Sequence, residues 1–155
     1  MRSVTFDKIA FENPLNESAL AFPILECFHI LGFAMTLGTI ALVDFRLLGF
    51  GLRQNAGELA KMLAPWTLFG LITVLLSGPL LFSSDPDMYY LNVSFQIKMV
   101  LLVLAIVFHY TIRRKLLRGE LSPGLNKPVA CISLVLWSSI IFAGIFIAFV
   151  VTPGQ

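Results

Sequence analysis

Charged side chains, cysteines and histidines are scarce in this chain of 155 residues. Only 13% of the residues are charged, 57% are hydrophobic, and there are two cysteines and two histidines. With a mean hydropathy of +0.87, this composition excludes an ordinary soluble domain. The cysteine content excludes a disulfide framework, and we expect Cys27 and Cys131 to be small packing residues. There is also no glycine-rich phosphate loop and no serine, histidine and acid pattern of a hydrolase.

Four hydrophobic runs are long enough to cross a bilayer, since its hydrocarbon core needs about 20 apolar residues of helix. They lie at residues 22–48, 65–82, 94–112 and 129–151. Each helix in a membrane satisfies its own backbone hydrogen bonds. We therefore predict an all-α fold, a four-transmembrane-helix bundle in contact with membrane lipid, which forms a single integral membrane domain over residues 1–155.

The segments outside these runs predict shorter features. The first stretch, MRSVTFDKIAFENPLNESALA, is polar and mixed in charge and lacks the basic start of a signal peptide. We expect it to be retained and to include a short N-terminal interfacial helix. Gly49 and Gly51 predict a turn after the first run, and a short amphipathic piece leads from there to Pro65.

Basic residues are concentrated in two of the three loops between the runs. Cytoplasmic loops carry the excess of lysine and arginine in membrane proteins. We therefore expect a multi-pass protein of the bacterial inner (cytoplasmic) membrane, with periplasmic N and C termini. The loops account for the net charge of +2, so this charge does not indicate nucleic-acid binding. The basic residues are Arg46, Arg53 and Lys61 in the first loop, and Arg113, Arg114, Lys115, Arg118 and Lys127 in the third.

Both histidines lie inside hydrophobic runs, where ionisable residues are costly and indicate function. In the first run, His29 follows Glu26 by about one helical turn on the same face. In the third run, His109 follows Lys98 by about three turns, and Arg113 follows one turn later. Each histidine therefore shares a helix face with other ionisable residues.

The first and third runs cross the membrane in the same direction, so the depths of their residues can be compared. We expect Glu26 to pair with Lys98 at the outer boundary. Asp44 lies about five turns after Glu26, at the opposite boundary. There it would meet Arg113 or Arg114.

Two interpretations of the histidines follow. In the first, the ion pairs brace the helices and each histidine makes a hydrogen bond. In the second, His29 and His109 bind the iron of haem b, because imidazole is a common axial ligand and bundles hold cofactors between facing helices. Lys98 would hold the propionates of an outer haem, and Arg113 or Arg114 those of an inner one. Small residues leave room for close helix packing or for a flat macrocycle: Gly32, Ala34, Gly38, Gly70, Gly78, Ala105 and Gly144.

Depth favours separate sites for the two histidines. With Glu26 and Lys98 level, His29 and His109 differ in depth by about 12 Å at a rise of about 1.5 Å per residue. One iron does not readily take both. Three arrangements of an outer haem remain open: Met99, nearly level with His29, as the second ligand, a histidine from a second chain, or a five-coordinate iron with an open side.

Three stretches carry a resemblance to known proteins: PILECFHILGFAMTLGTIALVDFRLLGFG, PWTLFGLITVLLSGPLLF and FQIKMVLLVLAIVFHYTIRR. Over residues 22–114 they resemble an uncharacterised bacterial family of four-helix membrane proteins. More distantly, the chain is similar to the bacterial haem-carrying, oxygen-independent protoporphyrinogen oxidase. The copper-resistance membrane family has a similar helix pattern.

The resemblance to the oxidase depends on a histidine in the first helix, matched by His29, and a lysine matched by Lys98. A third helix that ends in Tyr-His in that family compares with Phe108 and His109 here. The resemblance implies a haem b protein in which His29 is the first ligand candidate and His109 the second. Gln96 replaces a further histidine, and VDFRLL replaces an aromatic, proline-containing helix end, so haem binding is implied more strongly than porphyrinogen oxidation.

The sequence therefore predicts a haem b membrane protein that transfers electrons or acts as a membrane oxidoreductase. A quinone or a redox protein would be its partner, and we expect a homo-oligomer or a subunit of a larger membrane complex. The alternatives are a non-catalytic membrane subunit or scaffold, and a copper or small-solute membrane protein. The candidate cofactor residues are His29, His109, Met99, Lys98, Arg113, Arg114 and Glu26, with the two histidines as the metal ligands.

Overall fold

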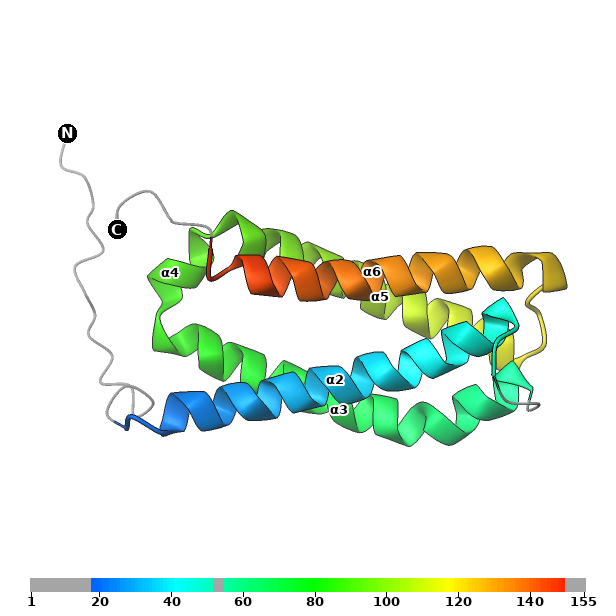
Figure 1. Ribbon diagram of the computed structural model, residues 1–155, viewed down its shortest axis with the longest axis horizontal. Helices are drawn as coiled ribbons and strands as arrows, with labels where there is room; N and C mark the ends of the chain where they lie inside the picture. The colour runs from blue at the N-terminus through cyan, green and yellow to red at the C-terminus, as the bar shows by residue number, and fades with distance from the viewer. Residues whose placement is uncertain (1–17, 52–54, 150–155) are drawn as a thin grey trace.

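The structure, a computed structural model, describes residues 18–51 and 55–149. Four long helices alternate in direction along the chain (Figure 1). All four are long and apolar enough to cross a membrane, which confirms the predicted all-α bundle of four spans. The short helices α4 and η1 lie at opposite ends, which we call the α4 end and the η1 end. In order, the elements are α2 (Ala21–Leu48), α3 (Ala56–Ser84), α4 (Pro86–Tyr90), α5 (Val93–Leu117), η1 (Pro123–Leu125) and α6 (Asn126–Phe146).

The second span begins earlier than predicted. Helix α3 starts at Ala56, where the Asn55 side chain accepts a hydrogen bond from the Gly57 N–H at 2.9 Å. The helix then continues through Pro65, because a membrane helix tolerates the one backbone bond that a proline removes. The predicted N-terminal interfacial helix precedes the first span. Residues 1–17 lie outside the described residues, and residues 18–20, which are described, are not helical.

Left-handed glycines end two of the long helices. Gly49 has φ of 98° and donates its N–H to the Arg46 carbonyl, while the Phe50 N–H bonds to the Phe45 carbonyl. Gly119, with φ of 68°, follows the end of α5 in the same way. Only glycine adopts this conformation without strain. The predicted turn after the first span is confirmed, and α5 runs beyond the predicted residue 112 to this glycine.

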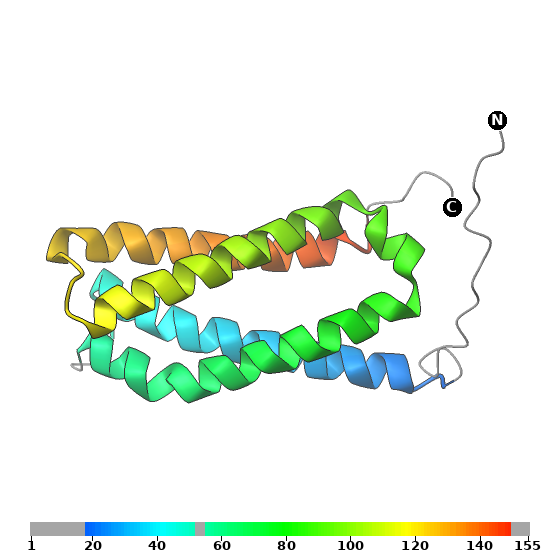
Figure 2. The same ribbon diagram turned by 180° about the vertical axis from the view of Figure 1, so that it is seen from behind.

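Helices α2 and α3 approach each other most closely at two glycines. A Cβ built on Gly70 would lie 2.6 Å from the Gly32 carbonyl oxygen and 2.6 Å from Thr36 Oγ1. Small residues allow backbones to come this close. Seen from both sides, α2 pairs with α3 and α5 pairs with α6 (Figures 1 and 2). Of the two roles considered for Gly32 and Gly70, close helix packing is the one that the structure shows.

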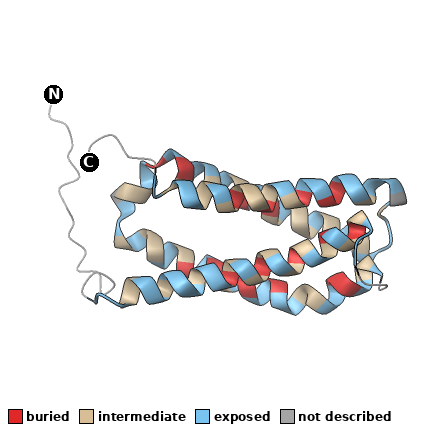
Figure 3. Cartoon of the chain, viewed as in Figure 1, coloured by how far each residue is buried: buried red, intermediate tan, exposed pale blue. Residues whose placement is uncertain are grey.

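The two halves of the bundle are packed to different degrees. A core cluster of Ile40, Leu102, Ala105, Trp137 and Ile140 lies in the middle, and buried residues continue toward the η1 end (Figure 3). Toward the α4 end the two helix pairs diverge (Figure 2). The half nearer the α4 end is therefore loosely packed. Among the described residues, those buried nearest the α4 end are Ser77, Asn92 and Ser94, and none is buried in the segments 21–31, 78–86, 95–101 and 141–149.

Both cysteines face away from the bundle. Cys27 and Cys131 are free and exposed, on outer surfaces that also expose large apolar side chains such as Phe28 and Val135. In a membrane these surfaces contact lipid, where a small apolar side chain is also stable. The cysteines are therefore small residues of the spans that face lipid and do not pack between the helices.

Candidate functional site

His29 is held by a side chain of the neighbouring helix. Its Nδ1 lies 2.8 Å from the Ser77 hydroxyl oxygen. That hydroxyl donates its single proton to the Thr73 carbonyl at 2.6 Å, so it accepts from the Nδ1–H of His29. The other ring nitrogen, Nε2, is then unprotonated, and its lone pair is available to a metal.

The surroundings of His29 come from all four long helices. A Cβ built on Gly78 of α3 would lie 3.6 Å from His29 Cε1, and one built on Gly144 of α6 would lie 3.4 Å from Lys98 Nζ. Lys98 is half-buried, and its charge acts on His29. An imidazole and an ammonium group therefore lie near each other in the loosely packed half, each beside a glycine.

Glu26 does not belong to this group. Its side chain is exposed, and no ion pair joins it to Lys98 within residues 18–51 and 55–149. The predicted ion pair between Glu26 and Lys98 is therefore wrong. The two residues lie at one end of the bundle, but Lys98 reaches toward α6 whereas Glu26 faces the surface.

Glu26 instead acts on Tyr89 of α4. Burial raises the pKa of the Tyr89 phenol, and the negative charges of Glu26 and Asp85 raise it further. The Tyr89 ring also packs against Phe95, with 5.6 Å between the ring centroids. This end of the bundle therefore has an acidic and aromatic rim, formed by α4 and the adjoining ends of α2 and α5.

Met99 is placed differently from Lys98, its neighbour in sequence. Its side chain is 43% exposed, as expected for a residue turned about 100° around the helix from its neighbour. The structure does not bring Met99 together with His29 in the interior.

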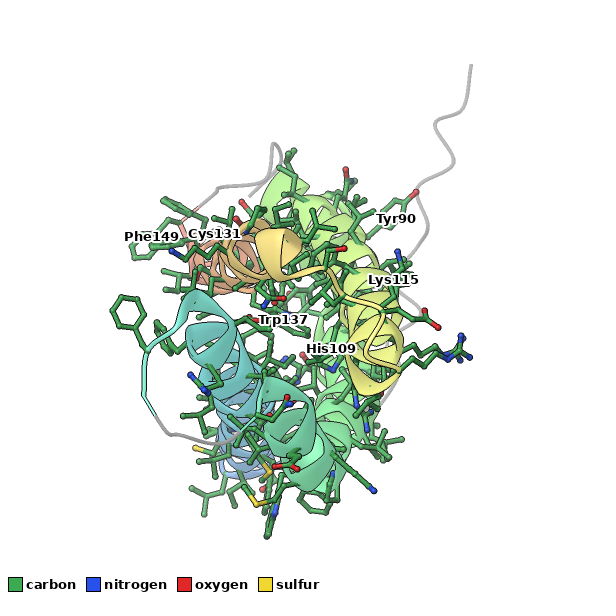
Figure 4. All side chains as sticks on the ribbon, turned by 90° about the vertical axis from the view of Figure 1, so that its right-hand side faces the viewer. Tyr90, His109, Lys115, Cys131, Trp137 and Phe149 are labelled. Carbon is green, nitrogen blue, oxygen red and sulfur yellow. The ribbon has the colours of Figure 1, made fainter. Side chains whose placement is uncertain are left out.

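Polar residues from all four long helices line a second region, a partly enclosed cavity of about 30 Å³ near the η1 end. His109 points into the space between the helices, as does Trp137 of the core (Figure 4). We call the cavity of about 30 Å³ the η1 cavity. Its polar lining residues are Thr39 and Asp44 of α2, Thr67 of α3, His109 and Arg113 of α5, and Ser133 of α6.

Two buried polar atoms of the η1 cavity have no hydrogen-bond partner in the described part of the chain. They are Oδ2 of Asp44 and Nε of Arg113. Asp44 accepts a hydrogen bond from the Ser133 side chain, but no ion pair joins it to Arg113 across residues 18–51 and 55–149. The structure thus brings Asp44 and Arg113 to one cavity, as predicted, without direct contact. Arg114 is exposed and lies outside the lining.

The two histidines occupy separate places. His29 contacts Ser77 and Gly78 in the α4 half, whereas His109 lines the η1 cavity and contacts the Tyr110 ring edge-on. Their separation agrees with the difference in depth expected from the sequence. Within the described ranges, no group of three or more His, Cys, Asp and Glu side chains is placed to hold a metal ion.

Sequence reasoning missed the hydroxyl partners at both places. Ser77 sets the hydrogen bonding of His29, and Ser133 is the partner of Asp44. Serines in membrane helices commonly bond to their own backbone, as Ser139 does here, so their identity alone does not mark them. The spacing of Thr73 and Ser77 by one turn is the one signal that could have indicated a polar face on the second span.

The fold and these intramembrane polar groups define a four-helix integral membrane protein. A model of a family of unknown function, DUF6644, matches residues 21–150, and the chain belongs to this family. No curated protein and no solved structure matched the chain. The resemblances to a haem-carrying oxidase and to copper-resistance proteins therefore remain predictions.

Proposed function

We propose that this protein binds haem b in the loosely packed α4 half of the bundle, with His29 as an axial ligand, and that it transfers electrons. The observation that carries the proposal is the 2.8 Å contact between His29 Nδ1 and Ser77. A histidine that ligates a metal commonly donates its other ring N–H to a fixed acceptor, which orients the ring and sets its tautomer. Ser77 is such an acceptor.

The residues around His29 fit a haem group. A macrocycle needs a flat apolar space beside the ligand. In the α4 half two glycines lie beside His29 and Lys98, and few residues are buried. Haem propionates need a cation, and Lys98 is half-buried within range of His29. An isolated buried ammonium group is costly in a membrane unless it has a partner, and a propionate carboxylate would be one.

Each residue has a distinct role in this proposal. His29 would hold the iron through Nε2, Ser77 would fix the imidazole ring, and Lys98 would bind a propionate. Haem, when bound, supplies one-electron transfer, and its potential depends on the axial ligands and on burial. The apolar outer faces of the helices keep the site within the membrane.

The proposal does not include Met99 or His109 as ligands. Met99 is 43% exposed, and the η1 cavity beside His109 has room for about two water molecules, not for a macrocycle. A second protein ligand would then be missing, or would be His29 of a second copy across a two-fold axis. The spin state of the iron distinguishes these two arrangements.

We further propose that the protein lies in the bacterial inner membrane with the η1 end in the cytoplasm. The η1 end carries the basic residues of the last part of α5, of the connection and of the first turn of α6: Arg113, Arg114, Lys115, Arg118 and Lys127. This orientation puts His29 on the periplasmic side. The redox partner would be a membrane quinone or a periplasmic protein that reaches the α4 end.

Absorption spectra of protein purified from haem-replete cells test the proposal. We expect a Soret band and the reduced α-band of haem b, both lost in His29→Ala. His109→Ala is the matched control, since it removes the other intramembrane histidine, and it should keep the haem-to-protein ratio. A colourless wild-type protein, or haem that survives His29→Ala and is lost in His109→Ala, would overturn the assignment.

Metal analysis of the same preparation separates the alternatives. Iron in proportion to haem supports the proposal. Copper without haem would favour a copper-handling membrane protein, and absence of both would leave a non-catalytic subunit of a larger complex.

A further inference from the structure

The η1 cavity contains a buried carboxyl oxygen and a buried guanidinium nitrogen that nothing described in the chain satisfies. Asp44 is 5% exposed, and its Oδ2 lacks a partner, as does Nε of Arg113. Buried polar groups in proteins are almost always hydrogen-bonded, to the protein or to ordered water. An unsatisfied polar group is especially costly within a membrane, where bulk water cannot reach it. Some further molecule therefore completes this site.

The size and polarity of the cavity point to water. A cavity of about 30 Å³ holds about two waters, since one needs roughly 10–15 Å³. A water molecule can donate to Asp44 Oδ2 and accept from the Arg113 N–H at the same time. An anion would be repelled by Asp44, and a metal cation by Arg113, so neither suits both groups.

The cavity is also close to the aqueous phase. Asp44 lies four residues before the end of α2 at Leu48, and Arg113 lies four residues before the end of α5 at Leu117. This separation is about one helical turn, or roughly 6 Å. Water and protons at the η1 end therefore have only a short distance to cross.

From these observations we infer that Asp44 is a proton-binding group in a hydrated cavity that exchanges protons with the aqueous phase at the η1 end. A proton arrives on a cavity water and is transferred to Oδ2 of Asp44. The water is left neutral, and the carboxylate becomes a neutral carboxyl group that donates a hydrogen bond to it. Release is the reverse step.

Two other ionisable groups face this carboxyl. His109 and Arg113 face the cavity from α5, while α3 and α6 contribute the uncharged Thr67 and Ser133 to its lining. Arg113 supplies a positive charge across the water, and Ser133 bonds to the carboxyl directly. The cavity does not include His29, so the inference is independent of haem binding.

Labelling of the wild-type protein with a hydrophobic carbodiimide tests the inference without any variant. This reagent adds to a protonated carboxyl group in an apolar environment and yields a stable N-acylurea, with no leaving group. Peptide mass spectrometry should find Asp44 labelled at the acid end of the pH range in which the protein stays folded, with labelling lost toward alkaline pH. The exposed carboxyls of Glu58 and Asp85 are internal controls and should stay unlabelled.

Infrared difference spectra between acidic and alkaline buffer provide the second measurement. A carboxylic carbonyl band should be present in the wild type and in His29→Ala, and should be missing in the nearly isosteric Asp44→Asn. Labelling that does not change with pH, or spectra that are the same in the wild type and Asp44→Asn, would overturn the inference. A signal that follows His109 instead of Asp44 would assign the proton to the imidazole and would also overturn it.

Discussion

The imidazole of His29 and the hydroxyl of Ser77 lie 2.8 Å apart although 48 residues separate them in the chain. The contact exists because Gly32 and Gly70 let α2 and α3 approach closely nearer the η1 end, about one turn from His29 along α2 and about two turns from Ser77 along α3. Packing thus brings together a histidine and a hydroxyl whose own proton is already donated to Thr73. The close helix contact and the tautomer of His29 are consequences of the same arrangement.

Ser77→Ala should weaken haem binding without abolishing it. The change leaves Nε2 in place but removes the acceptor that orients the ring, and loss of such a partner typically lowers metal affinity about 10–100-fold. Haem titration of the apoprotein measures the effect. Ser139→Ala is the matched control, because the Ser139 hydroxyl bonds to its own helix at Val135. Equal affinities of the two variants would show that Ser77 does not position the ligand.

Gly70→Ala should destabilise the bundle, whereas Gly38→Ala should not. A Cβ at Gly70 would lie 2.6 Å from backbone and side-chain atoms of α2, but a Cβ at Gly38 would meet nothing within 4 Å. Overpacking lowers the free energy of unfolding by about 1–3 kcal/mol. Replacing a glycine inside a helix by alanine raises it by about 0.5–1 kcal/mol where there is room for the Cβ. Thermal unfolding in detergent should therefore show a lower Tm for Gly70→Ala and an equal or higher Tm for Gly38→Ala. A lower Tm for both would show that helix contact is not the cause.

Asn92→Ala should reduce stability more than Asn55→Ala. Both side chains cap a helix, but Asn92 is buried, accepts from the Ser94 and Phe95 N–H groups, and also donates to the Ile147 carbonyl at 3.0 Å. Loss of a cap costs about 0.5–2 kcal/mol, and at Asn92 the bond between α5 and the end of α6 is lost as well. Chemical denaturation in one detergent measures the free energy of unfolding of both variants. A smaller loss of this free energy for Asn92→Ala than for Asn55→Ala would contradict the structure.

Much of the fold could be predicted from the sequence because the membrane imposes helices of a minimum length. The run at 22–48 coincides with α2 almost to its ends, and Gly49 directly follows it. The start of α3 could not be found in this way. Pro65 suggests a helix start in a soluble protein, but the cap at Asn55 begins the helix earlier, and the membrane tolerates the proline.

The candidate site was predictable in depth but not in rotation. Spacing along a helix placed Asp44 and Arg113 at one level, and they do line one cavity. It also placed Glu26 and Lys98 at one level, yet Glu26 turns to the surface and Lys98 to α6. Helix rotation depends on which faces pack, and that depends on contacts such as Gly32 with Gly70, which no single helix reveals.

Tyr89 should titrate at a higher pH than a free tyrosine. Burial raises the pKa of its phenol, and the nearby negative charges of Glu26 and Asp85 raise it further. The neutral phenol is favoured in the folded state, so its contribution to stability is present at neutral pH and is lost as pH rises through the raised pKa. In an ultraviolet titration that follows tyrosinate formation, the component that ionises at the higher pH should be missing in Tyr89→Phe. Glu26→Gln should move that component to lower pH, and an unchanged curve would show that the charge does not act on Tyr89.

Cysteine labelling determines which end of the bundle faces the cytoplasm. In a background with both native cysteines replaced, Asp85→Cys places a thiol next to α4, and Glu120→Cys places one near η1, both at exposed positions. The proposed orientation follows from the basic residues at the η1 end. A membrane-impermeant maleimide should therefore label Asp85→Cys in intact spheroplasts and Glu120→Cys only after lysis. The opposite pattern would place His29 on the cytoplasmic side and would require a cytoplasmic or membrane-dissolved redox partner.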